Sequence, residues 1–282
     1  STAWNFTAAT AISAKRRSPC DKMELRRIVL IGSGNLAESL ACAISKSHVE
    51  LVQIFARNPR RGPEVARLAG TTWTDDPQRL ATADIYLIAV SDRAVGEVAA
   101  SLPIPETAIV AHTAGSVPLE ALPERFARRA VFYPLQTFTA GRHVDFNEIP
   151  IFLETSTPDF RPELEAFART LSCTVRYADS AQRAYIHLAG VFACNFANAM
   201  YAAGERILSK AGLPYPLIKP LIAETAAKAC TATTPSTVQT GPAVRNDTAT
   251  QARHEALLAD DPALQTIYRT ISRRIWETSK KI

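Results

Sequence analysis

Three polar side chains interrupt an otherwise apolar stretch, YIHLAGVFACNFANAMY, at residues 185–201. At about 100° per residue in a helix, Asn198 lies about 20° and Asn195 about 80° from His187 around the axis. One quadrant of the predicted buried helix therefore carries an imidazole and two amides. An imidazole, with an ordinary pKa of about 6.5, can give a proton to a carbonyl or an imine, and an amide can hold a substrate oxygen.

A second candidate site is the sequence GSGNLA at residues 32–37, which directly follows a short apolar run typical of a buried strand. In a strand–turn–helix unit, Gly32 permits the tight turn and Gly34 lets the backbone approach a pyrophosphate. The helix that follows presents free N–H groups and a partial positive charge to that pyrophosphate. This context predicts a dinucleotide site. Its predicted contacts are Gly32, Ser33, Gly34, Asn35 and Leu36.

The sequence FARNPRR, at the end of the second predicted strand, indicates which dinucleotide binds. A site for NAD places an acidic residue there to hold the ribose 2′-hydroxyl group. Here Arg57 ends the strand, and its guanidinium suits a 2′-phosphate, which a carboxylate would repel. The sequence therefore predicts NADP(H), held by Arg57 and Asn58. Arg60 and Arg61 follow, and we expect at least one of them to form only a solvated helix start.

Two further turns follow strands of the same series and are expected at the same carboxyl edge of the sheet, where ligands bind. In AVSDRAV, Ser91 can reach the cofactor, whereas Asp92 is equally suited to cap a helix over residues 93–102. HTAGS, at residues 112–116, ends the next strand. Its candidates for the neighbourhood of the nicotinamide are His112, Thr113 and Ser116. His112 is a second candidate for proton transfer, with a purely structural role as the alternative.

The elements that position these residues alternate between strands and helices as far as about residue 179. Short apolar runs predict strands over residues 26–32, 49–57, 84–91, 106–116, 128–138, 149–155 and 173–178. Helical spacing predicts helices over residues 35–47, 59–70, 93–102 and 161–171, then over 180–212, 214–231, 247–259 and 262–278. Strands with helices followed by helices alone indicate two domains of different class. We predict an α/β Rossmann domain at residues 23–178 and an all-α substrate and dimerisation domain at residues 179–282.

The predicted helical domain contains a polar connection, TATTPSTVQTGPAVRND, at residues 231–247, which is long enough to be a binding loop. Arg245 is the best anchor there for a substrate carboxylate or phosphate, because a bidentate ion pair supplies both charge and orientation. Asp247 is expected to cap the next helix, and His254 lies on the same face seven residues later. A surface arginine and a half-exposed helix histidine are the alternative interpretation.

Composition excludes several classes of function. The chain has 282 residues, 47% of them hydrophobic and 21% charged, as in ordinary globular proteins. No apolar run approaches the roughly 18 residues of a membrane span. The net charge is +5, but residues 1–22 contribute +3 of it, so no basic face for nucleic acid is expected. The five cysteines are widely spaced without a CxxC pair, which predicts reduced thiols, no metal site and a cytoplasmic protein.

The first 22 residues show no amphipathic or alternating pattern. A leader rich in Ser, Ala and Arg is compatible with an organellar transit peptide. The interpretation we favour is a disordered or non-native leader, because Met23 stands directly before the first predicted strand.

These motifs together resemble the 6-phosphogluconate-dehydrogenase-like superfamily, which includes pyrroline-5-carboxylate reductase, ketopantoate reductase and the β-hydroxyacid dehydrogenases. The resemblance is closer to one subgroup, Rossmann-like proteins whose C-terminal domain has no assigned function. The segments that carry this resemblance are HTAGS, YPLQTF at residues 133–138, HLAGVFACNF and TGPAVRND. It covers nearly everything from Met23 onward. It implies an NADP-binding, dimeric oxidoreductase without an assigned substrate.

The chain departs from the better-known relatives at one position. In β-hydroxyacid dehydrogenases and ketopantoate reductase, a catalytic lysine lies four residues before an asparagine. If Asn195 matches that asparagine, Val191 stands at the lysine position and cannot transfer a proton. His187, one turn earlier on the same face, is a candidate for the vacant role. A core histidine bonded to the partner domain is the alternative.

The sequence thus predicts an NADP(H)-dependent oxidoreductase that transfers a hydride to or from a small anionic carbonyl or imine compound. We expect a homodimer formed through the C-terminal helices, in which Arg245 can serve the partner's site. The alternative is a non-catalytic NADP(H)-binding sensor or assembly protein, which the missing lysine favours. A deazaflavin in place of NADP is a weaker third interpretation because of the arginine cluster.

Overall fold

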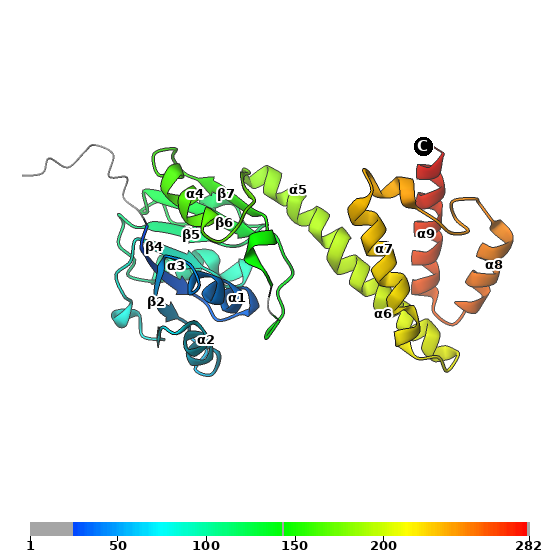
Figure 1. Cartoon of the computed structure of the whole chain (residues 1–282), viewed down its shortest axis with the longest axis horizontal. Coiled ribbons are helices and arrows are strands. Elements are labelled where there is room, and N and C mark those ends of the chain that lie inside the picture. Colours follow the sequence, from blue (N-terminus) through cyan, green and yellow to red (C-terminus); the bar gives the residue numbers. More distant parts are fainter. Residues whose placement is uncertain (1–24, 143, 281–282) are drawn as a thin grey trace, which may run out of the picture. The chain divides into compact units, whose positions relative to one another are not determined.

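The computed structural model describes residues 25–142 and 144–280, so the predicted leader at residues 1–22 lies outside the described residues. Two compact units make up the described chain, one ending at Gly190 and the other beginning at Val191 (Figure 1). None of the helices described is long and apolar enough to cross a bilayer.

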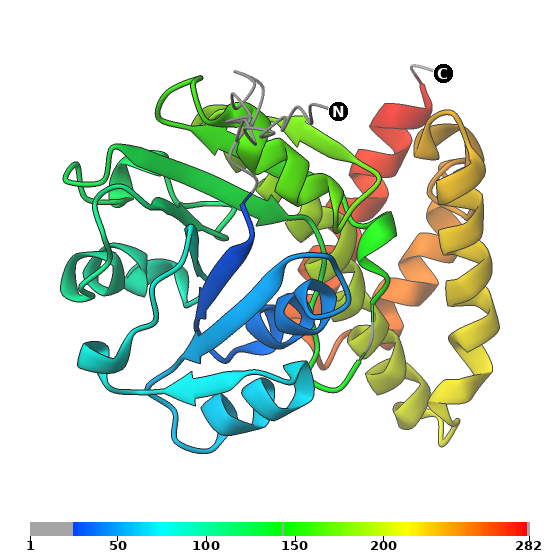
Figure 2. The ribbon, with the colours of Figure 1, turned by 60° about the vertical axis from the view of Figure 1, so that its left-hand side comes forward.

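The first unit is built on an eight-stranded sheet in the order β3-β2-β1-β4-β5-β6-β7-β8 (Figure 2). Its strands are β1 (Arg27–Ile31), β2 (Glu50–Phe55), β3 (Thr72–Thr74), β4 (Ile85–Ile88), β5 (Ile109–His112), β6 (Arg128–Pro134), β7 (Ile151–Thr155) and β8 (Val175–Tyr177). All neighbouring pairs are parallel except β6 and β7. The strand order reverses between β1 and β4, which is where open α/β sheets bind ligands. The prediction of an α/β Rossmann domain followed by a helical domain is confirmed.

Helices cover both faces of this sheet. They are α1 (Asn35–Ile44), α2 (Arg61–Ala69), α3 (Val95–Ser101) and α4 (Arg161–Arg169), and α5 (Ser180–Gly190) ends the first unit. Ile28 and Leu30 of β1 pack with residues of α1, α2 and α4. Val29 and Ile31 pack with residues of α3 against the opposite face. Burial on both faces explains why β1 reads as an unbroken apolar run rather than an alternating one.

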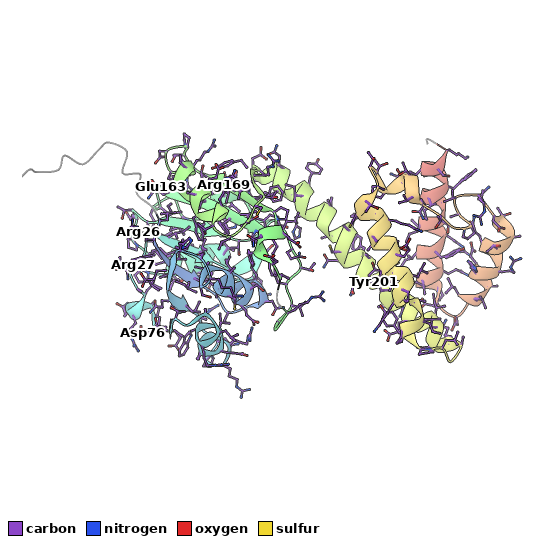
Figure 3. All side chains as sticks on the ribbon, in the orientation of Figure 1. Arg26, Arg27, Asp76, Glu163, Arg169 and Tyr201 are labelled. Atoms are coloured by element: carbon purple, nitrogen blue, oxygen red, sulfur yellow. The ribbon has the colours of Figure 1, made fainter. Side chains whose placement is uncertain are left out.

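Helix α5 is anchored to the sheet by one buried arginine. The Arg183 side chain is fully buried and forms an ion pair with Glu154 of β7. It also donates a hydrogen bond to the carbonyl of Val117, 2.8 Å away, in the segment after β5. A buried charge needs such partners because water does not reach it. The side chain of Arg169 on α4, in contrast, is 52% exposed and is solvated by water (Figure 3). Arg183 therefore ties α5 to the first unit.

The second unit is helical. It contains a π-helical turn, η5 (Val191–Phe196), and then α6 (Ala197–Lys210), α7 (Lys219–Thr231), α8 (Thr248–Leu257) and α9 (Pro262–Ser279). The carboxylate of Asp247 accepts a hydrogen bond from a backbone N–H in the first turn of α8, so its predicted role as an N-cap is confirmed. In this unit, the buried apolar residues among those described are Ala203, Ala243, Leu258 and Leu264.

The predicted helix over residues 185–201 is present, but it is interrupted by the π-helical turn η5. Phe192 is 64% and Phe196 48% exposed, so the described residues of the second unit do not bury them. Asn195 and Asn198 are exposed as well. The π-helical turn also adds a residue per turn, so a spacing of about 100° per residue does not hold across it.

Candidate functional site

The turn between β1 and α1 holds Gly32 in a conformation that only glycine tolerates. Its φ is +128°, and its N–H donates a hydrogen bond to the carbonyl of Phe55, 2.8 Å away, at the end of β2. A Cβ atom on Gly32 would stand 2.1 Å from the carbonyl oxygen of Ala89, just after β4. Gly32 thus lets the turn lie directly against the ends of the two neighbouring strands.

Gly34, in contrast to Gly32, faces open space. Its backbone is extended, with φ −74° and ψ −177°, and a Cβ atom there would meet nothing within 4 Å. Helix α1 begins at the next residue without a side-chain N-cap, so its first N–H groups are left for a ligand. A cavity of about 300 Å³ opens here, lined by Gly32, Ser33, Gly34, Asn35, Leu36, Ala89, Val90 and Ser91.

These residues fit the pyrophosphate of a dinucleotide, because glycine backbone, serine hydroxyls and a helix N-terminus converge on one open cradle. The five predicted contacts of the glycine turn line this one cavity together with Ser91 from the end of β4. Asn35 has an additional structural role, since its side-chain amide donates a hydrogen bond to the carbonyl of Phe138, 3.1 Å away.

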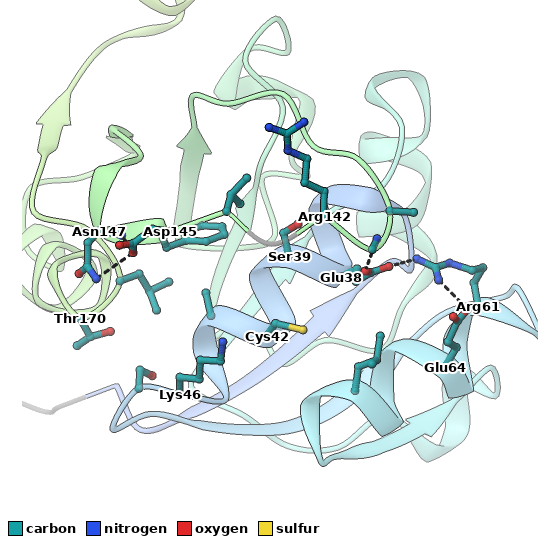
Figure 4. A pocket seen from close by; sticks show the side chains of 18 residues that line it. Glu38, Ser39, Cys42, Lys46, Arg61, Glu64, Arg142, Asp145, Asn147 and Thr170 are labelled. Atoms are coloured by element: carbon teal, nitrogen blue, oxygen red, sulfur yellow. Dashed lines mark hydrogen bonds and ion pairs between the residues drawn. The ribbon is translucent and has the colours of Figure 1, made fainter.

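The arginines after β2 differ in whether their side chains already form ion pairs within the protein. Asn58 caps the start of α2, because its Oδ1 accepts hydrogen bonds from the backbone N–H groups of Arg60 and Arg61, both 3.0 Å away. The Arg61 side chain forms ion pairs with Glu38 and Glu64 at the rim of a second cavity, of about 920 Å³ (Figure 4). The Arg61 guanidinium is therefore engaged in ion pairs within the protein rather than forming only a solvated helix start.

Arg57, just after β2, is an available cation, and Arg60 is likewise exposed with no side-chain partner among the described residues. Arg57 itself is exposed and forms no hydrogen bond or ion pair with any residue that the structure describes. A free guanidinium just after this strand, beside the glycine cradle in the fold, suits the 2′-phosphate of NADP.

His112 occupies a closed environment at the end of β5. It is fully buried, its Nδ1 accepts a hydrogen bond from the N–H of Ala114, and its Nε2 lies 3.3 Å from the carbonyl oxygen of Pro118. Burial, and next the positive charge of Arg183, lower the pKa of His112 to about 4. Both ring nitrogens of this neutral histidine are engaged with backbone. These contacts favour the structural alternative for His112.

One side-chain hydrogen bond joins the AVSDRAV turn to the HTAGS turn, and Thr113 bonds to the backbone of β4. Thr113 is buried, and its hydroxyl donates a hydrogen bond to the carbonyl of Ile88, 3.3 Å away. The hydroxyl of Ser116 donates to the carboxylate of Asp92. Asp92 does not cap a helix, because it is the first residue of a 3-10 turn, Asp92–Ala94, and α3 begins only after it with Ala94 at its N-cap position. The hydrogen bond between Ser116 and Asp92 thus joins the HTAGS turn to the AVSDRAV turn at the carboxyl edge of the sheet.

His187 makes one contact that the sequence did not predict. Its Nδ1 lies 3.4 Å from the hydroxyl oxygen of Tyr133, near the end of β6. The Tyr133 ring packs against the HTAGS turn, because a Cβ atom on Gly115 would stand 2.4 Å from its Cζ. Burial, and next the negative charge of Asp92, raise the pKa of Tyr133, so its phenol stays protonated. The only sequence signal for Tyr133 is its position at the start of YPLQTF.

Three predicted residues lie in the second unit. Asn195 is exposed on the π-helical turn. Arg245 is exposed and has no hydrogen bond or ion pair among the described residues. The Nδ1 of His254 lies 2.9 Å from the hydroxyl oxygen of Tyr268 on α9. Arg245 therefore has a free guanidinium, whereas the imidazole of His254 already has a partner.

Comparisons with family models match both parts of the chain. Residues 27–115 match the model described as NADP oxidoreductase coenzyme F420-dependent. Residues 149–275 match the domain of unknown function DUF2520. The search of curated proteins gave no match. The sequence-based resemblance to Rossmann-like oxidoreductases with a C-terminal domain of unassigned function is confirmed.

Solved structures agree with these matches. An imine reductase from Myxococcus stipitatus in complex with NADP+ is 12% identical, with coverage of 90% and 93% and a TM-score of 0.59, which shows a shared fold. Protein TM1727 from Thermotoga maritima is 21% identical, with coverage of 90% of this chain and 99% of that chain and a TM-score of 0.76. A candidate NADP oxidoreductase from Bacteroides fragilis is 41% identical, with coverage of 90% and 98% and a TM-score of 0.83. The chain therefore belongs to the family of the Bacteroides fragilis protein, and it carries an NADP oxidoreductase domain followed by the DUF2520 domain.

Proposed function

We propose that this chain is an NADP(H)-dependent oxidoreductase that acts on a small anionic carbonyl or imine compound. The observation that carries the proposal is the glycine cradle, which leaves the N-terminus of α1 uncapped and open to a pyrophosphate. Membership of a family with an NADP oxidoreductase domain supports it. When bound, the nicotinamide of NADPH supplies a hydride to the carbon of a C=O or C=N bond.

His187 is the proposed proton donor. It is half-buried, next to Tyr133 and the HTAGS turn, whereas both ring nitrogens of His112 are bonded to backbone. A protonated His187 gives its proton to the substrate oxygen or nitrogen, so that a carbonyl becomes a hydroxyl group and an imine becomes an amine. Water then returns the proton to the imidazole.

The remaining roles are assigned by chemical type. In this proposal, Arg57 holds the 2′-phosphate of the cofactor. Ser91 and Thr113 flank the cofactor at the carboxyl edge of the sheet. Arg245 binds the carboxylate or phosphate of the substrate, because its guanidinium is exposed and unpaired among the described residues. Asn195 offers an amide to the substrate oxygen, and His254 belongs to the same substrate-binding region.

A non-catalytic NADP(H)-binding sensor is the second candidate function. Val191 favours it, because that position holds a catalytic lysine in the hydroxyacid dehydrogenases that the chain resembles. The two functions differ in one result, which is whether bound NADPH is ever oxidised by a substrate.

We therefore expect NADPH oxidation with at least one member of a panel of 2-oxoacids, aldehydes and cyclic imines. His187→Ala should lower kcat by about 100-fold, in the range of lost acid–base catalysis, without weakening NADPH binding. His48→Ala, which removes an exposed imidazole from the turn before β2, is the matched control. Tight NADPH binding without oxidation by any compound of the panel would contradict the enzyme and support the sensor. Unchanged kcat in His187→Ala would remove His187 from the mechanism.

Cofactor selectivity tests Arg57. Arg57→Asp should weaken NADPH binding by about 100-fold and leave NADH binding nearly unchanged, because only NADPH carries the 2′-phosphate that the carboxylate repels. Binding is measured by the fluorescence of the reduced nicotinamide. Arg67→Asp makes the same charge change on an exposed residue of α2 and should leave both affinities unchanged. Equal loss of NADPH and NADH binding in Arg57→Asp would contradict the assignment.

We propose also that the protein is a homodimer joined through its C-terminal helices. The second unit buries four small or medium apolar residues among those described, too few for a core of its own. It exposes several large ones instead. Those at least 43% exposed are Phe192, Phe196, Ile207, Leu213, Leu217, Leu221, Leu257 and Ile271. An apolar surface of this extent is typical of an interface, and a second copy of the chain would cover the same surface on both molecules.

Sedimentation of the wild-type chain at micromolar concentration should give the mass of a dimer. Phe192→Asp or Leu221→Asp should shift the chain towards monomer, because each buries a charge in the proposed interface. Leu68→Asp is the control, since Leu68 is similarly exposed, at 47%, but lies on α2 of the first unit. A wild-type monomer, or variants that remain fully dimeric, would contradict the proposed interface.

The proposal places the protein in the cytoplasm with a small-molecule substrate rather than a nucleic acid. The described cysteines, Cys42, Cys173, Cys194 and Cys230, are all free thiols, in keeping with a reducing compartment.

A further inference from the structure

We propose that Tyr133 is the positioning residue for His187. Its phenol holds the imidazole in one orientation and keeps the Nδ1–H on the tyrosine side, so that Nε2 is the nitrogen that gives up a proton. This inference rests on the proposed function, because it assigns Tyr133 a role through the proposed proton donor.

The contact between the two side chains is the first observation. The hydroxyl oxygen of Tyr133 lies 3.4 Å from Nδ1 of His187, and the ring centroids are 6.4 Å apart. Within the described chain, the imidazole of His187 has no other hydrogen bond. Tyr133 is therefore the one described side chain that can select between the orientations of this imidazole.

The position of the phenol is fixed by its strand. Tyr133 lies in β6, which pairs with β5 on one side and β7 on the other, and it stands opposite Phe152 of β7. Its ring centroid lies 6.4 Å from that of Phe152. The phenol ring also lies so close to the backbone of Gly115 that a Cβ atom there would stand 2.4 Å from its Cζ. The hydroxyl group is thus held by sheet and turn rather than by a flexible segment.

The position of His187 is fixed as firmly. Arg183 lies one helical turn earlier in α5 and is fully buried. Its guanidinium forms an ion pair with Glu154 of β7 and donates to the carbonyl of Val117, just after the HTAGS turn. Strand β7 is also the neighbour of β6. Strand β7 therefore supports both partners of the Tyr133–His187 contact, since it pairs with the strand that carries Tyr133 and holds α5 through Arg183.

The chemistry follows from the two ring nitrogens. A protonated imidazole carries a hydrogen on each nitrogen, and a phenol oxygen can accept the one on Nδ1 in a charge-assisted bond. After Nε2 has released its proton, the neutral ring keeps Nδ1–H and the same partner. The proton is thus transferred without rotation of the ring, which is the benefit of an oriented histidine in other catalytic arrangements.

The surroundings of the Tyr133 phenol keep it protonated while it accepts the hydrogen bond from His187. Burial raises the pKa of Tyr133, the carboxylate of Asp92 raises it further, and the guanidinium of Arg183 acts in the opposite direction. Asp92 is in turn bonded to the hydroxyl of Ser116. Tyr133 therefore serves as a neutral partner of the imidazole, and His187 carries the change of charge.

Tyr133→Phe tests the proposal, because it keeps the ring and its contacts with Gly115 and Phe152 and removes only the hydroxyl group. We expect an unchanged melting temperature and NADPH affinity, a kcat about tenfold lower, and a changed pH profile of kcat. Tyr177→Phe is the matched control, since its hydroxyl bonds to Arg161 and Glu165 on α4 instead. Tyr133→Phe should have no further effect in a His187→Ala background, because a positioning residue acts only through its partner.

A measurement on the free protein separates this inference from the proposed function. In ¹⁵N spectra of histidine-labelled protein, neutral His187 should carry its hydrogen on Nδ1, and Tyr133→Phe should release the ring to a mixture of tautomers dominated by Nε2–H. The same tautomer in wild type and Tyr133→Phe, or an equal loss of kcat in the His187→Ala background, would overturn the role of Tyr133. Absence of turnover in the wild type would contradict the proposed function, and the tautomer measurement would still decide whether Tyr133 holds the ring.

Discussion

The contact between Gly32 and the carbonyl of Ala89 is the constraint on which the site depends. The turn after β1 must pass so close to the end of β4 that a Cβ atom would come within 2.1 Å of that oxygen, and its φ of +128° excludes other residues independently. This approach lies at the point where the strand order reverses. Because the turn is pressed against the strands, α1 starts directly at the sheet edge, and its uncapped N–H groups face an open cradle.

The two candidate proton donors, His112 and His187, differ in how deeply they are buried. His112 and His187 have the same side chain but different surroundings. His112 is buried in the sheet, with both ring nitrogens in contact with backbone groups. His187 lies half-buried on α5. The buried Arg183 affects both, since its charge helps to keep His112 neutral and its ion pair with Glu154 anchors the helix that carries His187. The proposed proton chemistry therefore belongs to α5 rather than to β5.

Local patterns in the sequence predict the central strands, the glycine cradle and the cap at Asp247, because each depends on neighbouring residues. The three-residue strand β3 escapes prediction because TWT is too short to show a period. The partnership of Tyr133 with His187 escapes it because β6 and α5 meet only through tertiary packing. The helix over residues 185–201 is misjudged for another reason. Apolar periodicity indicates that a face will be covered, but it does not say whether its own chain or a second molecule covers it.

The most direct test of the account is the affinity of Gly34→Val for NADPH, measured beside its melting temperature. Gly34 has an extended backbone that valine can adopt and empty space where its side chain would stand, so the variant should fold as the wild type does. The added side chain would occupy the cradle, and we predict that NADPH binding weakens by about tenfold or more. A variant with the wild-type melting temperature and undiminished NADPH affinity would contradict the central claim that this cradle holds the cofactor.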